Sequence, residues 1–284
     1  MPNTDTHAHI YSPDETRYPM IADPLRPPPG TGTVEHLQGE MAARGVERVV
    51  AIHTSTAYRW DNRFLADSAR ANAPWMVGVC TLNPEDPASP DLLRRLVADH
   101  NVRGMRSVPA EGAGRHLDHP GVDALWSTAE ELGIVTNVLI HVDLADELGA
   151  MLRRHRGLRV VLDHCMYPKG VDGVDGPVMR RVLALSEHPN LHAKLTWLVD
   201  SSSQDYPFSD TYPLLRAVID AYGPARCVWG SDFPCELWTP KTTYGQHLDL
   251  FTGALGLSDA EKEMILSVTP GRLWFGDVLA GARL

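Results

Sequence analysis

Short apolar runs alternate with longer amphipathic segments eight times along this chain. The runs contain many β-branched residues and lack polar alternation, which is typical of parallel strands buried on both faces. They cover residues 4–10, 46–54, 75–82, 102–107, 134–141, 158–164, 191–197 and 226–231. Eight strand–helix repeats within 284 residues predict an α/β fold, a (β/α)8 TIM barrel forming a single domain over residues 1–284.

The segments between the predicted strands have helical periodicity. They cover residues 33–44, 62–71, 89–100, 122–132, 144–155, 178–187 and 212–222. Four of them are followed by a glycine that predicts a helix stop, namely Gly45, Gly133, Gly157 and Gly223. Ser258 and Glu261 have the capping-box spacing and predict one more helix.

An open doubly wound sheet is the alternative fold for such an alternation. It would normally show a glycine-rich turn after the first strand, where a phosphate group binds. Here residues 11–14 read Tyr-Ser-Pro-Asp, which offers no such turn. The sequence therefore favours the closed barrel.

Charge and hydropathy exclude two classes of partner. The formal net charge is −10, and no Lys/Arg-rich run is present that could follow a phosphate backbone, so nucleic acid is not an expected partner. No apolar run approaches the ~20 residues that span a bilayer, and residues 1–10 do not resemble a secretory signal. The four cysteines are scattered without metal-binding spacing. We expect a cytoplasmic protein that acts on a small molecule.

Polar residues gather at the ends of the predicted strands. His7 and His9 lie near the end of the first strand, on the same face because side chains alternate along a strand. The fifth predicted strand ends at His141, the sixth at His164, and Asp232 directly follows the eighth. Barrel enzymes place their active sites at this carboxyl end, so we expect these side chains to converge.

Four imidazoles and one carboxylate suit a borderline-soft divalent metal such as Zn²⁺, with one position left open for water. Each residue also has a simpler interpretation. A lone His-X-His pair is a weak signal, and His141 could merely end a strand. His164 could be a hydrogen-bonded core residue, and Asp232 could cap a turn. The joint position at strand ends is what favours a site.

The chain resembles the amidohydrolase superfamily, in its amidohydrolase 2 branch. Within that branch the pattern is most similar to pyrone-dicarboxylate lactonase and the sugar lactonases. The resemblance covers nearly the whole chain and rests on Asp5-Thr-His-Ala-His9, Gly45-Val-Glu-Arg-Val-Val50, Asp61-Asn62, Gly78-Val79, Val102-Arg-Gly-Met-Arg106, Val161-Leu-Asp-His164, Ala193-Lys194 and Gly230-Ser-Asp-Phe-Pro234.

The resemblance implies roles for individual residues. His7 and His9 would be the strand-1 pair, His164 the strand-6 histidine and Asp232 the general base. Arg106 matches a position that often binds a substrate carboxylate, and a bidentate guanidinium suits that task.

Further residues are candidates for contact with the substrate. Lys194 matches a lysine common in strand 7, although a lysine extending from the strand to solvent explains it equally well. Tyr58, Tyr167 and Trp197 fall on or near loops at the same end of the barrel and are candidate pocket walls. The resemblance also admits a homodimer.

His141 departs from the lactonase pattern. Lactonase-type members often lack a histidine there, and several are thought to work without a metal, whereas the decarboxylases of the branch have one and bind zinc or manganese. His141 therefore favours one bound divalent metal, with a metal-free site as the alternative.

The leading hypothesis is hydrolysis of a lactone or a related carbonyl compound that carries a carboxylate or hydroxyl groups. The alternatives are a metal-dependent non-oxidative decarboxylase of an aromatic or unsaturated acid and a non-catalytic binding barrel.

Overall fold

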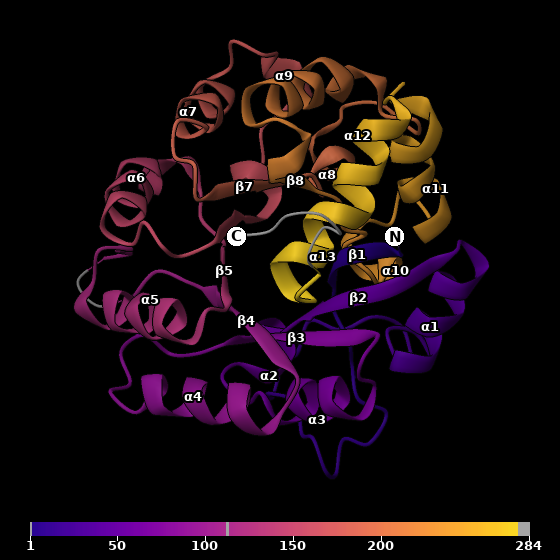
Figure 1. Cartoon of the computed structure of the whole chain (residues 1–284). Coiled ribbons are helices and arrows are strands. Elements are labelled where there is room, and N and C mark those ends of the chain that lie inside the picture. The colour runs from indigo at the N-terminus through magenta and orange to yellow at the C-terminus, as the bar shows by residue number, and fades with distance from the viewer. Residues whose placement is uncertain (1, 112–113, 278–284) are drawn as a thin grey trace.

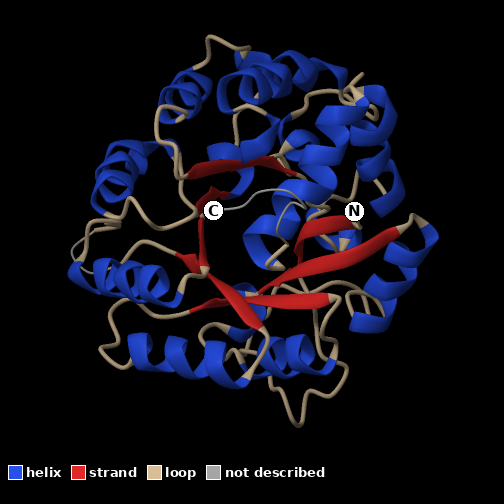
Figure 2. Ribbon diagram, in the orientation of Figure 1, coloured by secondary structure: helices blue, strands red, loops and turns tan. Residues whose placement is uncertain are grey.

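The computed structural model describes residues 2–111 and 114–277. Eight strands form one sheet in the order of the sequence, and every neighbouring pair is parallel. Helices surround the strands, as Figures 1 and 2 show. The strands are β1 (Asn3–Ala8), β2 (Val46–Ile52), β3 (Met76–Thr81), β4 (Val102–Ser107), β5 (Val135–Val138), β6 (Val160–Leu162), β7 (Leu191–Lys194) and β8 (Cys227–Val228).

The segment that follows β8 closes the barrel against β1. The Thr6 backbone N–H donates to the Trp229 carbonyl at 3.1 Å, and the His9 N–H donates to Phe233 at 2.8 Å. In the other direction, the Asp232 N–H donates to the His7 carbonyl at 2.9 Å. These bonds join the first and last strands, so the fold is the predicted (β/α)8 barrel and the open-sheet alternative is excluded.

The predicted helices are present, with ends within about two residues of the expected positions. Gly45, Gly133 and Gly223 have positive φ angles after their helices, as expected, but helix α6 ends at Arg154 and Gly157 has no positive φ angle. The α-helices are α1 (Val34–Ala43), α2 (Ser55–Tyr58), α3 (Arg63–Ala71), α4 (Ser89–Asp99), α5 (Pro120–Leu132), α6 (Ala145–Arg154), α7 (Pro177–Leu185), α8 (Leu198–Ser201), α9 (Tyr212–Tyr222), α10 (Cys235–Trp238), α11 (Tyr244–Asp249), α12 (Asp259–Glu263) and α13 (Thr269–Trp274).

The last four strands are shorter than the sequence pattern predicts. The apolar runs continue beyond the ladder hydrogen bonds, because most residues directly after these strands are buried too, although His141 is exposed. His141, His164, Trp197 and Asp232 therefore lie in the segments that follow strands β5 to β8, and not within the strands. This placement frees their backbones from strand geometry.

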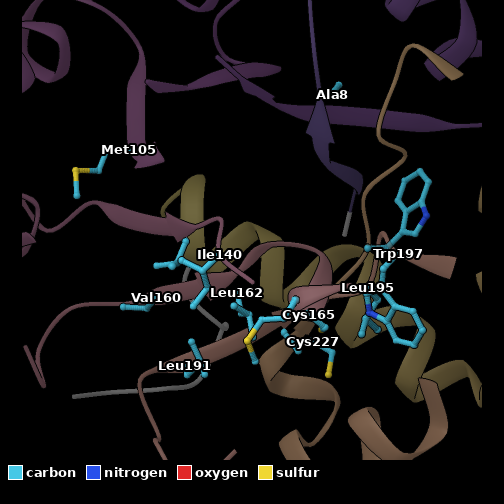
Figure 3. Close-up of a cluster of buried hydrophobic side chains, with 14 of the residues drawn as sticks. Ala8, Met105, Ile140, Val160, Leu162, Cys165, Leu191, Leu195, Trp197 and Cys227 are labelled. Carbon is cyan, nitrogen blue, oxygen red and sulfur yellow. The ribbon is translucent and has the colours of Figure 1, made fainter. Parts of the chain in front are cut away.

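Two apolar layers hold the barrel together. The larger layer lies between the strands and the helices, and Figure 3 shows part of it around Leu162, Cys165 and Leu195. The inner layer consists of strand residues such as Val50 and Val161, and it packs against Trp274 of α13.

Trp274 can approach the barrel closely because Gly104 of β4 has no side chain. A Cβ atom at Gly104 would lie 3.3 Å from the Trp274 Nε1 atom and 2.9 Å from the Val135 carbonyl oxygen.

In the part of the chain that the structure describes, no helix is long and apolar enough to cross a membrane.

Candidate active site

His7 of β1 and His9, one residue past the end of β1, both point into the barrel mouth, as their alternation predicts. His7 is fully buried and His9 is 5% exposed, and their Nε2 atoms lie 3.3 Å apart. The Nδ1 atom of His9 lies 3.1 Å from the Ile52 carbonyl oxygen, which can only accept a hydrogen bond. His9 therefore carries its proton on Nδ1, and its Nε2 lone pair faces His7.

Asp232 completes the group from the segment after β8, which closes the barrel against β1. Its Oδ1 atom lies 3.5 Å from Nε2 of His7 and 3.7 Å from Nε2 of His9. Asp232 has a φ angle of +57°, a conformation that aspartate tolerates better than most residues.

The neighbouring residues hold Asp232 in place. The buried Asp5 carboxylate accepts hydrogen bonds from the Ser231 N–H at 2.9 Å and from the Ser231 hydroxyl at 2.6 Å. Gly230 is needed because a Cβ atom there would lie 2.6 Å from the Cβ of His7.

These three side chains fit a divalent metal. Their ligand atoms all lie within 4.8 Å of one another. A tetrahedral zinc site with ~2.0 Å bonds has neighbouring ligand atoms about 3.3 Å apart, close to the 3.3, 3.5 and 3.7 Å found here. The Ile52 carbonyl also orients His9 in the way that metal-binding histidines are usually oriented. Neither His141 nor His164 belongs to this cluster.

A buried aspartate, Asp163, forms the floor beneath the cluster. It accepts hydrogen bonds from Nε of Arg106 at 3.0 Å and from the amide of Asn137 at 2.9 Å, and Nζ of Lys194 lies 3.0 Å away. Burial alone would raise its pKa, but the charges of Lys194 and Arg106 outweigh burial and lower the pKa of Asp163 to about 2. Asp163 is therefore a fixed anion.

Lys194 lies under His7 and does not reach the barrel mouth. It is fully buried, and its ammonium donates to the Thr6 carbonyl at 2.9 Å and to Nδ1 of His7 at 3.2 Å. The Nδ1 atom of His7 then accepts, so its ring proton is on Nε2 and points towards the Nε2 lone pair of His9. A metal on Nε2 of His7 would have to displace this proton. The sequence-based alternatives of substrate contact or extension to solvent do not match this position.

His164 and Tyr167 are placed by an unusual backbone. Four consecutive residues, 164–167, have positive φ angles between 46° and 59°. Such a conformation costs of order 1–2 kcal/mol per residue, so the surrounding packing must hold it. His164 lies with its Nδ1 atom 2.6 Å from the Thr196 hydroxyl, and burial lowers its pKa to about 3. Its ring lies 4.7 Å from the ring of His7 and stacks on Tyr167 at 4.9 Å.

Arg106 retains free donors towards the barrel mouth. Its Nε atom is used by Asp163, and its terminal guanidinium nitrogens have no hydrogen-bond partner among the described residues. The side chain is 7% exposed. A fixed, partly used guanidinium is well suited to bind an anionic group.

Three other predicted residues lie away from the cluster. His141 is exposed, because β5 ends three residues earlier and the chain has left the barrel wall. Its ring faces Tyr167 at a distance of 5.5 Å. Tyr58 packs against Tyr11 and accepts a hydrogen bond from the Ser12 N–H at 2.8 Å. Trp197 is fully buried in the core (Figure 3), because the short connection from β7 to α8 stays inside the core. Trp197 is therefore not a pocket wall.

Asp232 has the properties of a general base. Burial and, to a lesser degree, the negative charge of Asp200 raise its pKa to about 7, while Arg106 opposes the shift. A carboxylate with a pKa near neutrality can both accept and return a proton at physiological pH.

A cavity of about 870 Å³ opens over the carboxyl ends of β2 to β6, and His7, His9 and Asp232 are not among its lining residues. Its wall includes Thr81, Ile140, His141, Met166 and Tyr167. The His7–His9–Asp232 cluster lies at the β1–β8 side, and Tyr167, which lines the cavity, stacks on His164, whose ring lies 4.7 Å from that of His7. The volume is in the range of small-molecule sites.

Sequence reasoning assigned no role to Asp163, Asn137, Thr196 or Asp5. Asp163 and Asp5 both sit beside histidines already singled out, and an acid inside an apolar strand end requires buried partners. This requirement for buried partners is the sequence signal that could have placed Asp163 and Asp5 near the site. Asn137 and Thr196 carried none, because they became neighbours of the cluster only through barrel closure.

Comparison with known proteins agrees with this geometry. The model of the amidohydrolase family matches residues 4–276. The chain is 27% identical over 234 residues to L-fucono-1,5-lactonase of Burkholderia ambifaria, covering 81% of this chain and 79% of that protein.

Two solved structures share the fold. One is a putative 2-pyrone-4,6-dicarboxylic acid hydrolase from Pseudomonas putida, with a TM-score of 0.82, 22% identity and 98% of each chain covered. The other is a zinc-bound structure from Burkholderia multivorans, with a TM-score of 0.76, 23% identity, and 97% of this chain and 99% of that chain covered.

Proposed function

Because the chain belongs to the amidohydrolase family and is a hydrolase of that type, we propose that it hydrolyses a lactone, with Asp232 activating water. The observation that carries the proposal is the Asp232 carboxylate, buried beside two imidazoles with a pKa raised to about 7. The name of the Burkholderia relative and that of the Pseudomonas structure both denote ester-ring opening, which supports the choice of reaction.

The reaction requires one proton to be taken and returned. Asp232 removes a proton from water as the water oxygen bonds to the lactone carbonyl carbon. The bond between that carbon and the ring oxygen then breaks, and the Asp232 carboxyl gives its proton to the departing alkoxide. The product is an open-chain hydroxy acid, and the carboxylate of Asp232 is regenerated.

We propose that His7, His9 and Asp232 hold a divalent ion, and that it is zinc, because two imidazoles and a carboxylate suit that metal. The zinc-bound Burkholderia structure supports this choice. When bound, the ion supplies a Lewis acid that polarises the carbonyl and acidifies water.

The remaining residues position these groups. Arg106 binds a carboxylate of the substrate through its free guanidinium nitrogens, while its Nε atom stays on Asp163. Lys194 acts through His7, whose ring it orients from below. His164, held by Thr196, faces the reacting group from the β6 side.

The first experiment is the Asp232→Asn substitution, assayed by acid release from a panel of lactones. We expect kcat to fall by about 10²–10⁴, as for the loss of a general base, with an unchanged circular dichroism spectrum. Asp175→Asn, on the exposed loop after β6, is the matched control and keeps wild-type activity. Near-wild-type turnover in Asp232→Asn would disprove the role of this carboxylate.

A decarboxylase is the second candidate, because 5-carboxyvanillate decarboxylase from Sphingomonas paucimobilis shares the fold at a TM-score of 0.67 and 16% identity. Carbon dioxide release from aromatic acids, with no acid release from lactones, would support this candidate and overturn the lactonase. Elemental analysis of the purified protein tests the metal independently of either activity.

A further inference from the structure

A second cavity, of about 390 Å³, opens at the amino end of the barrel, the end opposite to the candidate active site. Its wall comes from the starts of β2, β3 and β4, from the residues just before β5 and β6, and from the end of α13 with the two residues that follow. Figure 1 shows α13 across the middle of the ring of strands. The volume is in the range of small-molecule sites.

The wall of this cavity is positively charged. Among the described residues, it contains no aspartate or glutamate, and it contains the four arginines Arg48, Arg103, Arg159 and Arg272. The chain as a whole has a formal net charge of −10, so this hollow runs against the overall balance of charge. Guanidinium groups gathered around one hollow repel one another, and an anion bound between them would remove that repulsion.

Two of the four arginines belong to the inner face of the barrel. Arg48 lies two residues before Val50 in β2, and Arg159 lies two residues before Val161 of β6. Val50 and Val161 are part of the inner apolar layer, and side chains alternate along a strand, so the two arginines share that face. The carbonyl of Arg159 accepts from the Thr136 N–H at 3.0 Å, which extends the strand pairing to this residue.

Only one of the two inner arginines has an acidic partner among the described residues. Nη1 of Arg48 lies 2.6 Å from Oδ2 of Asp277. The guanidinium of Arg159 is partly buried and donates to backbone carbonyls at the ends of α5 and α13. Burial lowers the pKa of Arg159, with no nearby acid to oppose the shift. Its positive charge is therefore held in the wall without a negative partner.

The other two arginines are exposed and have most of their donors free. Arg103 donates to the Val102 carbonyl at 3.3 Å through Nη1, and its other guanidinium nitrogens have no partner among the described residues. The guanidinium of Arg272 has no partner in the described part of the chain. Free guanidinium nitrogens match the oxygen pairs of phosphate and carboxylate groups, which they bind with two parallel hydrogen bonds.

We propose that the cavity at the amino end of the barrel binds a small anion with at least two negative charges, a phosphate or polycarboxylate compound. Three guanidinium groups without an acidic partner call for more than one charge on the ligand. The inference goes beyond lactone hydrolysis and does not depend on it, because His7, His9 and Asp232 are not part of this wall.

The test is isothermal titration calorimetry on the purified full-length protein at low ionic strength. Pyrophosphate is the probe for phosphate chemistry, and tricarballylate is the probe for carboxylate chemistry. We expect one saturable site for at least one of these probes. Its affinity should fall as sodium chloride is added, because salt screens the guanidinium charges.

A double substitution assigns the binding to this cavity. Arg103→Gln/Arg272→Gln should weaken binding at least about 10-fold, because each change removes hydrogen bonds to a charged ligand. Arg95→Gln/Arg180→Gln is the matched control, since it removes two charges from exposed arginines of α4 and α7 that lie outside the wall.

A second control addresses the other end of the barrel. Arg115→Gln/Lys169→Gln removes two positive charges from the wall of the 870 Å³ cavity and should leave the affinity unchanged. Circular dichroism and the melting temperature verify the fold of each variant. If Arg103→Gln/Arg272→Gln does not fold, Arg272→Gln replaces it and should weaken binding about 3-fold, the effect of one exposed charge.

The possible outcomes are distinct. Weaker binding in Arg103→Gln/Arg272→Gln, with wild-type affinity in both controls, supports the inference. Equal weakening in Arg95→Gln/Arg180→Gln would show that only net charge matters. Loss of binding in Arg115→Gln/Lys169→Gln would place the anion in the other cavity. Either of these results, or the absence of saturable binding for both probes, overturns the inference, and none of them bears on lactone hydrolysis.

Discussion

His247 should make the barrel sensitive to acid, although it lies outside the active site. It belongs to α11, is fully buried, and its Nδ1 atom accepts a hydrogen bond from Nε1 of Trp229 at 3.0 Å. Burial lowers its pKa from 6.5 to about 4, because the interior disfavours the imidazolium form. The folded protein therefore keeps His247 neutral at a pH where the unfolded chain protonates it.

The direction and size of the effect follow from this difference. At pH 7 the residue is neutral in both states and proton uptake does not alter stability. Between pH 6.5 and 4 the unfolded state binds a proton that the folded state does not, so the free energy of unfolding falls as the pH falls. At about 1.4 kcal/mol per pH unit, the loss from this one group reaches about 3 kcal/mol by pH 4.

The assay is urea unfolding followed by circular dichroism at pH 7, 6, 5 and 4, for wild type and His247→Gln. Glutamine offers an acceptor to Trp229 but does not titrate, so the variant should lose stability more slowly on acidification. We expect the difference in free energy of unfolding between wild type and His247→Gln to shift by about 3 kcal/mol against the wild type between pH 7 and pH 4. His116→Gln is the control, since the His116 side chain is 54% exposed. Parallel curves for wild type and His247→Gln would refute the reasoning.

Two further predictions concern residues around His7. Lys194→Met should bind zinc at least about 10-fold more tightly in equilibrium dialysis, because no ammonium then holds the ring proton on Nε2 of His7. Its free energy of unfolding should fall by about 3–5 kcal/mol, because Asp163 loses a buried partner. Lys169→Met is the exposed control, and equal zinc affinities for wild type and Lys194→Met would contradict the assignment. Gly230→Ala should lower both the melting temperature and kcat, because its Cβ atom would lie 2.6 Å from the Cβ atom of His7. The control is Gly253→Ala, which should change neither, since no atom lies within 4 Å of a Cβ atom built there. A Gly230→Ala variant with the melting temperature and kcat of the wild type would show that His7 can move freely.

The fold could be predicted from sequence because the signals for it are local. Each apolar run and each amphipathic helix is a property of about ten consecutive residues, and each records burial on one side of the barrel wall. The pairing of His7 with His9 is equally local, since alternation along a strand places both on one face. The position of Asp232 opposite them followed from the resemblance and from the rule that barrel strands end at one rim.

Residues with similar sequence signals were separated only by the tertiary structure. His141, His164 and Trp197 all follow strands, yet one is exposed, one lies beside His7, and one is buried in the core. Their positions depend on where each strand stops and how the next loop turns, including the left-handed run at residues 164–167. These turns are set by packing against other loops and not by nearby residues.

The sequence by itself determined the barrel, the end of the barrel expected to carry chemistry, and five candidate ligand side chains at that end, namely His7, His9, His141, His164 and Asp232. Tertiary structure decided that only His7, His9 and Asp232 of these form the cluster, that Lys194 and Asp163 lie beneath it, and that the cavity opens over β2 to β6. The physical reason is that strand and helix patterns reflect burial of neighbouring residues, whereas a site depends on atoms brought within a few ångströms from distant parts of the chain when the barrel closes.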